Sequence, residues 1–161
     1  MITLKEALTD DVFGLAEKLF QEYAESLGVD LEFQNFSEEL SNIQNQYSRP
    51  NGVLILAIEA GFRPMGCFGV RPMEGPICEL KRMYLRKQAR GKGIGKLMLK
   101  KSISMARELG YEKMRLDTLP SMQSAIKLYQ SMGFYEIGPY RYNPIEGTKY
   151  FEIEVMNQPS D

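Results

Sequence analysis

Apolar residues recur at helical spacing near the start of this 161-residue chain. Thr9 and Asp10 can cap a helix. The apolar positions that follow are separated mostly by three or four residues, as on one helix face: Val12, Leu15, Ala16, Leu19, Phe20 and Tyr23. We expect a second helix to begin at Ser37, because Glu38 and Glu39 suit a helix N-terminus.

Short apolar segments follow and predict strands. Residues 53–60 and 65–70 are joined by the sequence GFRP, which is typical of a hairpin. The composition of residues 71–76, RPMEGP, predicts a loop. Residues 77–85, ICELKRMYL, are then expected to form a third strand.

The second half of the chain alternates helices with strands. A helix follows a glycine-rich loop and ends at Gly110. Residues 113–118 predict a strand, residues 121–132 a helix, and residues 134–140 and 149–155 two further strands. This order predicts an α/β (α+β) fold in which one mixed sheet carries the helices.

Composition restricts the classes of function. The chain is 43% hydrophobic and 25% charged, as in a soluble globular domain of ordinary size. Its 20 basic and 21 acidic residues give a net charge of −1, which offers nucleic acid no broad attraction. Histidine is absent, which excludes Ser-His-Asp or Cys-His catalysis. We expect no metal site, and acid–base chemistry must use carboxylates, tyrosine or lysine.

The cysteine content and the N-terminal sequence indicate a cytoplasmic protein. Cys67 and Cys78 are too few for a disulfide framework, and the first ten residues do not resemble a signal peptide. The longest apolar run, VLILAI, is much shorter than a membrane span. No association with a membrane is therefore expected.

Five cations and three glycines fall within residues 86–99, RKQARGKGIGKLML, just before a predicted helix. Glycines let backbone N–H groups turn toward a ligand, and a helix N-terminus favours an anion. A Walker A loop is excluded, because Arg90 stands where its first glycine belongs and Leu97 follows Lys96. A dinucleotide loop lacks its third glycine, although Asp117 lies where a ribose-binding acid is expected.

A third use of such a loop fits better. The pattern Arg90-x-x-Gly93-x-Gly95 resembles the acetyl-CoA pyrophosphate loop of the GNAT N-acetyltransferase superfamily. Residues 79–99 together resemble the strand, loop and helix that carry the acyl donor in that superfamily. Residues 125–134, AIKLYQSMGF, resemble its second recurrent segment. The two segments occur in the expected order with the predicted strand 113–118 between them.

The resemblance implies one GNAT-like domain over residues 1–161. Its mixed sheet would be splayed at the acyl-CoA site, where strand 77–85 parts from strand 113–118, and flanked by about four helices. Residues 1–76 would form the N-terminal helices and hairpin, residues 77–137 the acyl-CoA-binding core, and residues 138–161 the C-terminal hairpin.

The resemblance also implies which residues bind acetyl-CoA. The pantetheine arm is expected to hydrogen-bond the backbone of Met83 and Leu85. The pyrophosphate is expected on the loop and first helical turn: Arg90, Gly91, Lys92, Gly93, Ile94, Gly95 and Lys96. Where the family often has asparagine, this chain has Met122, so Gln123 or Ser124 would replace that contact.

Two catalytic residues are expected. Strand alternation places Glu79, Lys81, Met83 and Leu85 on one face, so that Glu79 can project toward the thioester. Glu79 is the candidate base if burial raises its pKa; alternatively it pairs with Lys81 or another cation. Tyr129 matches the family tyrosine that serves as general acid, although a tyrosine at helical spacing is also typical of a core. A main-chain N–H near Met83 would stabilise the oxyanion.

The expected activity is acetyl-CoA-dependent transfer of an acetyl group to a primary amine of a small molecule or peptide, through a tetrahedral intermediate. Two alternatives remain open at this point. One is a non-catalytic CoA- or nucleotide-binding regulatory module, and the other is a dinucleotide-dependent oxidoreductase that uses Asp117. Since many superfamily members form dimers, a homodimer is a further hypothesis.

Overall fold

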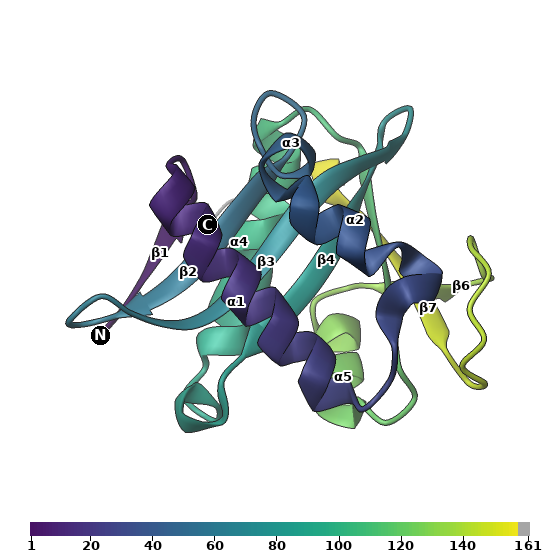
Figure 1. Cartoon of the computed structure of the whole chain (residues 1–161). Coiled ribbons are helices and arrows are strands. Elements are labelled where there is room, and N and C mark those ends of the chain that lie inside the picture. The colour runs from purple at the N-terminus through teal and green to yellow at the C-terminus, as the bar shows by residue number, and fades with distance from the viewer. Residues whose placement is uncertain (158–161) are drawn as a thin grey trace.

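A seven-stranded sheet forms the centre of the molecule in a computed structural model that describes residues 1–157 (Figure 1). Its strand order is β1-β2-β3-β4-β5-β7-β6. The strands are β1 (Ile2–Glu6), β2 (Val53–Glu59), β3 (Arg63–Glu74), β4 (Ile77–Leu85), β5 (Lys113–Thr118), β6 (Tyr135–Ile137) and β7 (Lys149–Glu154). Only β4 and β5 run parallel; the other neighbours are antiparallel, so the sheet is mixed as predicted.

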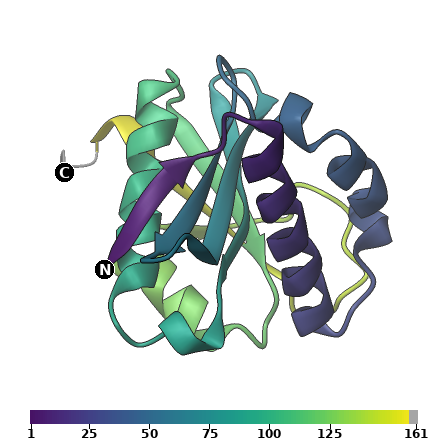
Figure 2. The same ribbon diagram turned by 60° about the vertical axis from the view of Figure 1, so that its left-hand side comes forward.

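Helices cover both faces of this sheet (Figures 1 and 2). One face carries the N-terminal helices α1 (Asp10–Leu27), α2 (Phe36–Ser41) and α3 (Ile43–Gln46), and the other carries α4 (Ile94–Glu108) and α5 (Gln123–Ser131). Three 3-10 turns, at Leu31–Gln34, Lys87–Ala89 and Val155–Asn157, complete the described chain. None of the helices in residues 1–157 is long and apolar enough to cross a membrane.

Strand alternation divides the core between the two faces. In β2, Leu54 and Leu56 pack toward α1, whereas Val53 and Ile55 pack toward α4. Helix α1 begins after Thr9, whose hydroxyl accepts a hydrogen bond from the Val12 N–H. Three residues of its predicted apolar face are buried, Ala16, Leu19 and Phe20, and the other three are half-buried. The predicted hairpin, glycine loop, helices and last strand are all present.

Several local expectations were wrong. Residues 2–6 form edge strand β1, which the sequence did not indicate clearly because its exposed and half-buried positions alternate without a strong apolar run. Strand β3 continues to Glu74, through most of the expected loop, because it pairs with β4. The second helix is divided into α2 and α3 by Asn42, and β6 covers only part of residues 134–140. Residues 158–161 of the expected C-terminal hairpin lie outside the described residues.

The expected splay of the sheet is present between β4 and β5. The two strands pair at three consecutive positions, Ile77 with Lys113, Cys78 with Met114 and Glu79 with Arg115, and at no later position. Beyond Glu79 the facing edges are no longer joined by ladder hydrogen bonds. The sheet is therefore open at the place where the chain's two recognisable segments meet.

A β-bulge in β4 changes which side chains share a face. Gly69 faces Lys81 and Cys67 faces Tyr84, so two residues of β4, Arg82 and Met83, lie opposite one residue of β3. Arg82 has a φ of 57°, which is unusual for a residue with a side chain. The expected alternation consequently fails after Lys81.

Glu79 and Lys81 face the N-terminal helices, whereas Met83 and Leu85 pack against the α4 and α5 side. The bulge thus separates the two residues expected to hold pantetheine from the residue expected to act as the base.

Gly69 gives a test of this packing. A Cβ on Gly69 would overlap the ring of Tyr47, a fully buried side chain whose hydroxyl is hydrogen-bonded to Glu39. We expect Gly69→Ala to lower the free energy of unfolding by about 1–3 kcal/mol, the usual cost of overpacking.

The matched control is Gly14→Ala in α1, where a Cβ meets nothing within 4 Å. This change should stabilise the helix by roughly 0.5–1 kcal/mol. Urea unfolding of both variants measures the difference, and equal stability of the two variants would contradict the packing described.

Candidate active site

A small cavity of about 30 Å³ lies where β4 and β5 part. It exceeds the roughly 10–15 Å³ that one water molecule occupies, so it can hold an amino group. Both strand edges and the two neighbouring helical segments line it: Tyr23, Leu80, Lys81, Arg82, Met83, Leu116, Asp117, Thr118, Met122 and Tyr129.

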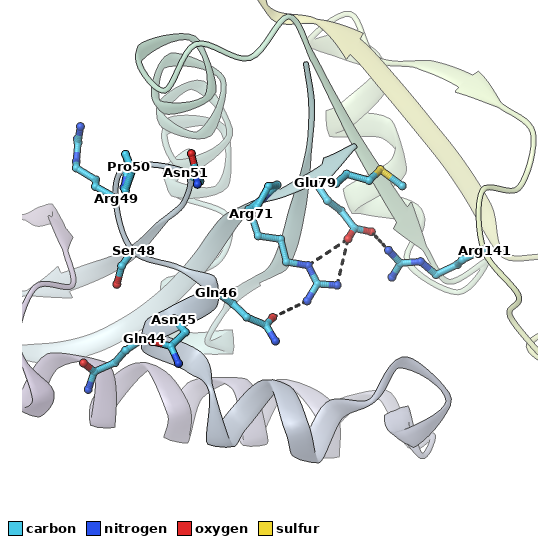
Figure 3. A pocket seen from close by; sticks show the side chains of 12 residues that line it. Gln44, Asn45, Gln46, Ser48, Arg49, Pro50, Asn51, Arg71, Glu79 and Arg141 are labelled. Atoms are coloured by element: carbon cyan, nitrogen blue, oxygen red, sulfur yellow. Dashed lines mark hydrogen bonds and ion pairs between the residues drawn. The ribbon is translucent and has the colours of Figure 1, made fainter. Parts of the chain in front are cut away.

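Glu79 lies beside this cavity at the centre of a buried cationic cluster. Its side chain is 1% exposed and accepts hydrogen bonds from Arg71, Arg141 and the Tyr140 hydroxyl, the last at 2.8 Å. Figure 3 shows Arg71 and Arg141 approaching the carboxylate from opposite sides. The Lys81 ammonium lies 4.0 Å away.

The charged form of Glu79 is therefore stabilised. Its expected role as a base required the opposite, namely a pKa raised by burial. Burial raises its pKa, but Lys81, Arg141 and Arg71 more than offset this and hold the pKa at about 2. A carboxylate this acidic is a weak proton acceptor at neutral pH. The alternative that Glu79 pairs with Lys81 and other cations agrees with this geometry.

Lys81 has the better properties for accepting a proton. Its side chain is buried, it lines the small cavity, and its ammonium donates a hydrogen bond to Gln34 Oε1 at 3.1 Å. Burial lowers its pKa to about 8, despite the opposing effect of Glu79. A base with a pKa close to the working pH is the most effective in proton transfer.

A second buried ion pair supports the bulge next to Lys81. The Arg82 guanidinium donates to Glu39 at 2.7 Å, and the hydroxyl of Tyr47 donates to the same carboxylate. Burial raises the pKa of Glu39, but Arg82 outweighs burial and the pKa is lowered. Helix α2 thereby holds the unusual backbone of β4 from one side of the sheet.

Tyr129 belongs both to the core and to the site. It is 6% exposed and packs against the rings of Phe134 and Phe151, yet it also lines the small cavity. Burial raises the pKa of its hydroxyl, with further contributions from Tyr23 and Asp117. The phenol therefore stays protonated at neutral pH and is able to donate a hydrogen bond into the cavity.

Two polar atoms on β5 lack a hydrogen-bond partner among the described residues. They are Oδ2 of Asp117 and Oγ1 of Thr118, both buried in residues that line the small cavity. Asp117 Oδ2 lies 3.8 Å from Arg141 Nη1, which is an ion-pair distance and not a hydrogen bond. Buried polar atoms without partners are uncommon, and these two are available to a ligand.

A larger cavity of about 530 Å³ adjoins the small one and gathers most of the predicted acetyl-CoA contacts. Seven expected site residues line it: Met83, Leu85, Arg90, Gly95, Gln123, Ser124 and Tyr129. The two cavities share Tyr23, Met83, Met122 and Tyr129. Asp117 does not line this cavity, whereas Arg90 and Gly95 of the glycine loop do. The dinucleotide alternative needs Asp117 and the loop to bind one ligand, so this arrangement does not support it.

The glycine loop has the backbone that anion binding needs. Gly91 and Gly93 have φ values of 77° and 79°, and a side chain at either is disfavoured by the backbone alone. Helix α4 begins after Gly93 without a side-chain cap, which leaves its first N–H groups available to a ligand. Lys92, Gly93 and Ile94 line a third cavity beside β1, while Gly91 and Lys96 line none of the cavities described here.

The sequence reading missed several residues that the fold brings to the splay. Tyr23 lines both adjoining cavities, while Arg71, Tyr140 and Arg141 surround Glu79. Residues 139–151, PYRYNPIEGTKYF, contain Tyr140 and Arg141 in a tyrosine-rich segment, and Arg71 lies in residues 71–76, which were expected to form a loop. Lys81 was recognised only as a partner for Glu79.

A family model settles the relationship of this fold to known proteins. Residues 15–134 match the model of the acetyltransferase (GNAT) family. The chain belongs to the GNAT family. It is an acyltransferase by that membership and by its N-acetyltransferase relatives.

Individual relatives agree with the family. An uncharacterized N-acetyltransferase of Schizosaccharomyces pombe is 41% identical over 138 residues, which cover 85% of each chain. A GNAT acetyltransferase structure from Staphylococcus aureus has a TM-score of 0.78 at 23% identity, over 96% of this chain and 99% of that one.

The solved structure of spermidine N-acetyltransferase from Vibrio cholerae, in complex with CoA and spermine, has a TM-score of 0.71 at 18% identity. The match covers 97% of this chain and 98% of that one. At this identity the likeness concerns the fold alone. Residues 1–157 contain no cluster of acidic or cysteine side chains able to hold a metal ion.

The charge cluster gives a stability prediction for Glu79→Gln. The change leaves Arg71, Lys81 and Arg141 without their shared carboxylate, and we expect a loss of about 3–5 kcal/mol at pH 7. Because the folded pKa of Glu79 is lowered from 4.5, its stabilisation is complete above pH 4.5 and is lost as the pH falls toward 2. The difference between wild type and variant should therefore shrink over that interval.

Urea unfolding between pH 7 and pH 3 measures this difference. The control is Glu136→Gln, which changes a largely exposed carboxylate paired only loosely with Lys149, and it should have no measurable effect. A difference for Glu79→Gln that stays constant below pH 4.5 would show that the carboxylate is not stabilised as described.

Proposed function

We propose that this chain transfers the acetyl group of acetyl-CoA to a primary amine. The observation that carries the proposal is the junction of two cavities at the sheet splay. The larger one, lined by the predicted donor contacts, shares Tyr129 and Met83 with the small one that contains Lys81 and Asp117. A thioester that reaches the junction from the donor side would meet a protonated phenol and a buried amine.

The edge of β4 supports the placement of pantetheine. After Glu79 this edge has no strand partner in β5, and an extended amide chain can satisfy unpaired backbone groups as another strand would. Met83 and Leu85 remain our proposed contacts. The Leu85 carbonyl accepts a hydrogen bond from Arg90 Nε at 2.8 Å, so Arg90 would move or share this carbonyl when the donor binds.

The α4 N-terminus supports the placement of the pyrophosphate. The N–H groups of Ile94, Gly95 and Lys96 come at the start of a 15-residue helix, where the helix dipole favours negative charge. A Cβ on Gly93 meets nothing within 4 Å, so the space beside the loop is open to a ligand. We propose that Arg90 and Lys92 add charge to this site.

The chemistry uses groups at the junction. We assign to neutral Lys81 the removal of a proton from the acceptor ammonium, which frees the nitrogen lone pair to attack the thioester carbonyl. The main-chain N–H of Met83 would stabilise the tetrahedral oxyanion. When the C–S bond breaks, Tyr129 donates a proton to the departing thiolate and recovers one from the nitrogen, which becomes the amide. Glu79 orients Lys81 and the arginines.

Donor binding tests the proposal directly. A ligand that binds only the folded state stabilises it by about 2.7 kcal/mol at 100 times its Kd, so acetyl-CoA and CoA should raise the unfolding midpoint whereas NAD should not. Gly93→Glu should abolish the rise, because it adds strain and negative charge at the pyrophosphate site.

Gly110→Glu is the matched control, since Gly110 has a φ of 93° at the opposite end of the same helix region. It should lower the midpoint of the free protein and keep the rise caused by acetyl-CoA. A rise with NAD alone, or no thiol release with any amine when acetyl-CoA binds, would count against acetyl transfer.

The pH profile tests Lys81. If Lys81 must be neutral, kcat/KM for acetyl transfer should increase with pH and level off above its pKa of about 8. Lys81→Met should lower kcat/KM by about 10²–10⁴-fold, the usual contribution of a general base, and remove this pH dependence.

Tyr129→Phe distinguishes the proposed general acid from the proposed general base. It should lower kcat while kcat/KM still rises toward pH 8, because Lys81 is still present. Thiol release measured between pH 6 and pH 9.5 distinguishes the variants. A wild-type profile that persists in Lys81→Met would assign the base to another group.

A further inference from the structure

A polar cavity of about 770 Å³ is lined by Glu79 and shares no lining residue with the 530 Å³ cavity (Figure 3). Amide and hydroxyl side chains from α3 and from the segment that joins it to β2 form one wall: Gln44, Asn45, Gln46, Ser48 and Asn51. Arg71 and Arg141 form another wall together with Glu79. None of these residues is among those expected to contact acetyl-CoA.

The two arginines have hydrogen-bonding capacity left over. A guanidinium has five N–H donors. Arg71 uses three of them, two on Glu79 and one on Gln46 Oε1. Arg141 has one recorded hydrogen bond among the described residues, to Glu79, and both side chains keep about a fifth of their surface exposed. A planar anion in this cavity could therefore accept from both.

The local charges also favour an added anion. Four cations lie in one connected network at the splay: Arg71, Lys81, Arg82 and Arg141. Their carboxylate partners number three: Glu39, Glu79 and Asp117. While Lys81 is protonated, four minus three leaves one excess positive charge in this largely buried region, where a buried cation needs a partner. When Lys81 is neutral, three cations face three carboxylates and the charges balance.

The anion site is connected to the reaction site through Arg141. One end of its guanidinium contacts Glu79 at the polar cavity, and Nη1 lies 3.8 Å from Asp117 Oδ2 at the small cavity. Asp117 Oδ2 has no hydrogen-bond partner among the described residues. A cationic amine is the complementary ligand for that oxygen, and Lys81 lines the same small cavity.

We propose that the acceptor is an amine that also carries a carboxylate, of the amino acid class. Its carboxylate binds Arg71 and Arg141 in the polar cavity, and its ammonium lies toward Asp117 and Lys81. This assignment rests on the proposed acetyl transfer. It distinguishes this chain's acceptor from polyamines, which offer positive charge alone.

Matched acceptors test the assignment. Purified protein with acetyl-CoA is given the common amino acids, the corresponding amino acid amides and spermidine, and thiol release is measured for each. Amides keep the amine and side chain but lack the carboxylate. We expect the preferred amino acid to exceed its amide by about tenfold or more in kcat/KM, since a charged hydrogen bond contributes about 1.5–3 kcal/mol.

Variants locate the carboxylate. Arg141→Gln and Arg71→Gln should lower the ratio of kcat/KM for the preferred amino acid to kcat/KM for its amide by about tenfold or more, because only the amino acid has a carboxylate to lose its partners. Arg115→Gln is the control, because Arg115 has similar exposure and pairs with Glu152 and Glu74 outside the cavity. Retention of the midpoint rise with acetyl-CoA verifies that each variant is folded.

Two results would overturn the assignment without affecting the donor site. One is faster acetylation of amides or spermidine than of every amino acid. The other is no transfer to any amino acid although acetyl-CoA raises the unfolding midpoint. Loss of that rise in wild type would instead remove the proposed acetyl transfer itself.

Discussion

The parting of β4 from β5 after Glu79 is the constraint on which the site depends. Parallel strands normally continue their ladder, but here pairing stops after three positions and two backbone edges face an opening. An opening in a sheet exposes groups that must find other partners. In this chain the bulge at Arg82 lies directly beside the opening, and Glu39 of α2 holds the Arg82 side chain there.

Buried ion pairs surround the opening. Glu39 of α2 pairs with Arg82, and Glu79 pairs with Arg71 of β3 and with Arg141 of the loop before β7. Removing one member of such a set leaves an uncompensated charge, which costs more than the intact pair contributes. The N-terminal helices, the central strands and the C-terminal loop are thus joined through buried ion pairs around the candidate active site.

The features of the fold that depend on local periodicity or on a short motif could be predicted from the sequence. The mixed sheet, the splay and the helix after the glycine loop follow from local spacing and the two family segments, and seven predicted site residues line the 530 Å³ cavity. The faces of β4 beyond Lys81 could not be predicted, since a bulge shifts the alternation by one residue. The side chain of the bulge residue Arg82 pairs with Glu39, which lies 43 positions away in the sequence. The pKa of Glu79 likewise depends on Arg141, which lies 62 positions away in the sequence.

The pKa of Lys81 is connected to the positive charge of its neighbours. Burial is the main reason that this pKa falls to about 8, and Arg82 and Arg141 lower it further by repelling the ammonium. An acceptor carboxylate on Arg71 and Arg141 would weaken that repulsion while its ammonium brings a new cation to Asp117. In a zwitterion the carboxylate and the ammonium have opposite effects on Lys81, so that its pKa would stay close to the value in the protein without acceptor. A polyamine would add positive charge to the same network without a carboxylate to balance it. The charges at the site would therefore favour an amino acid over a polyamine, whatever the side chain of the amino acid.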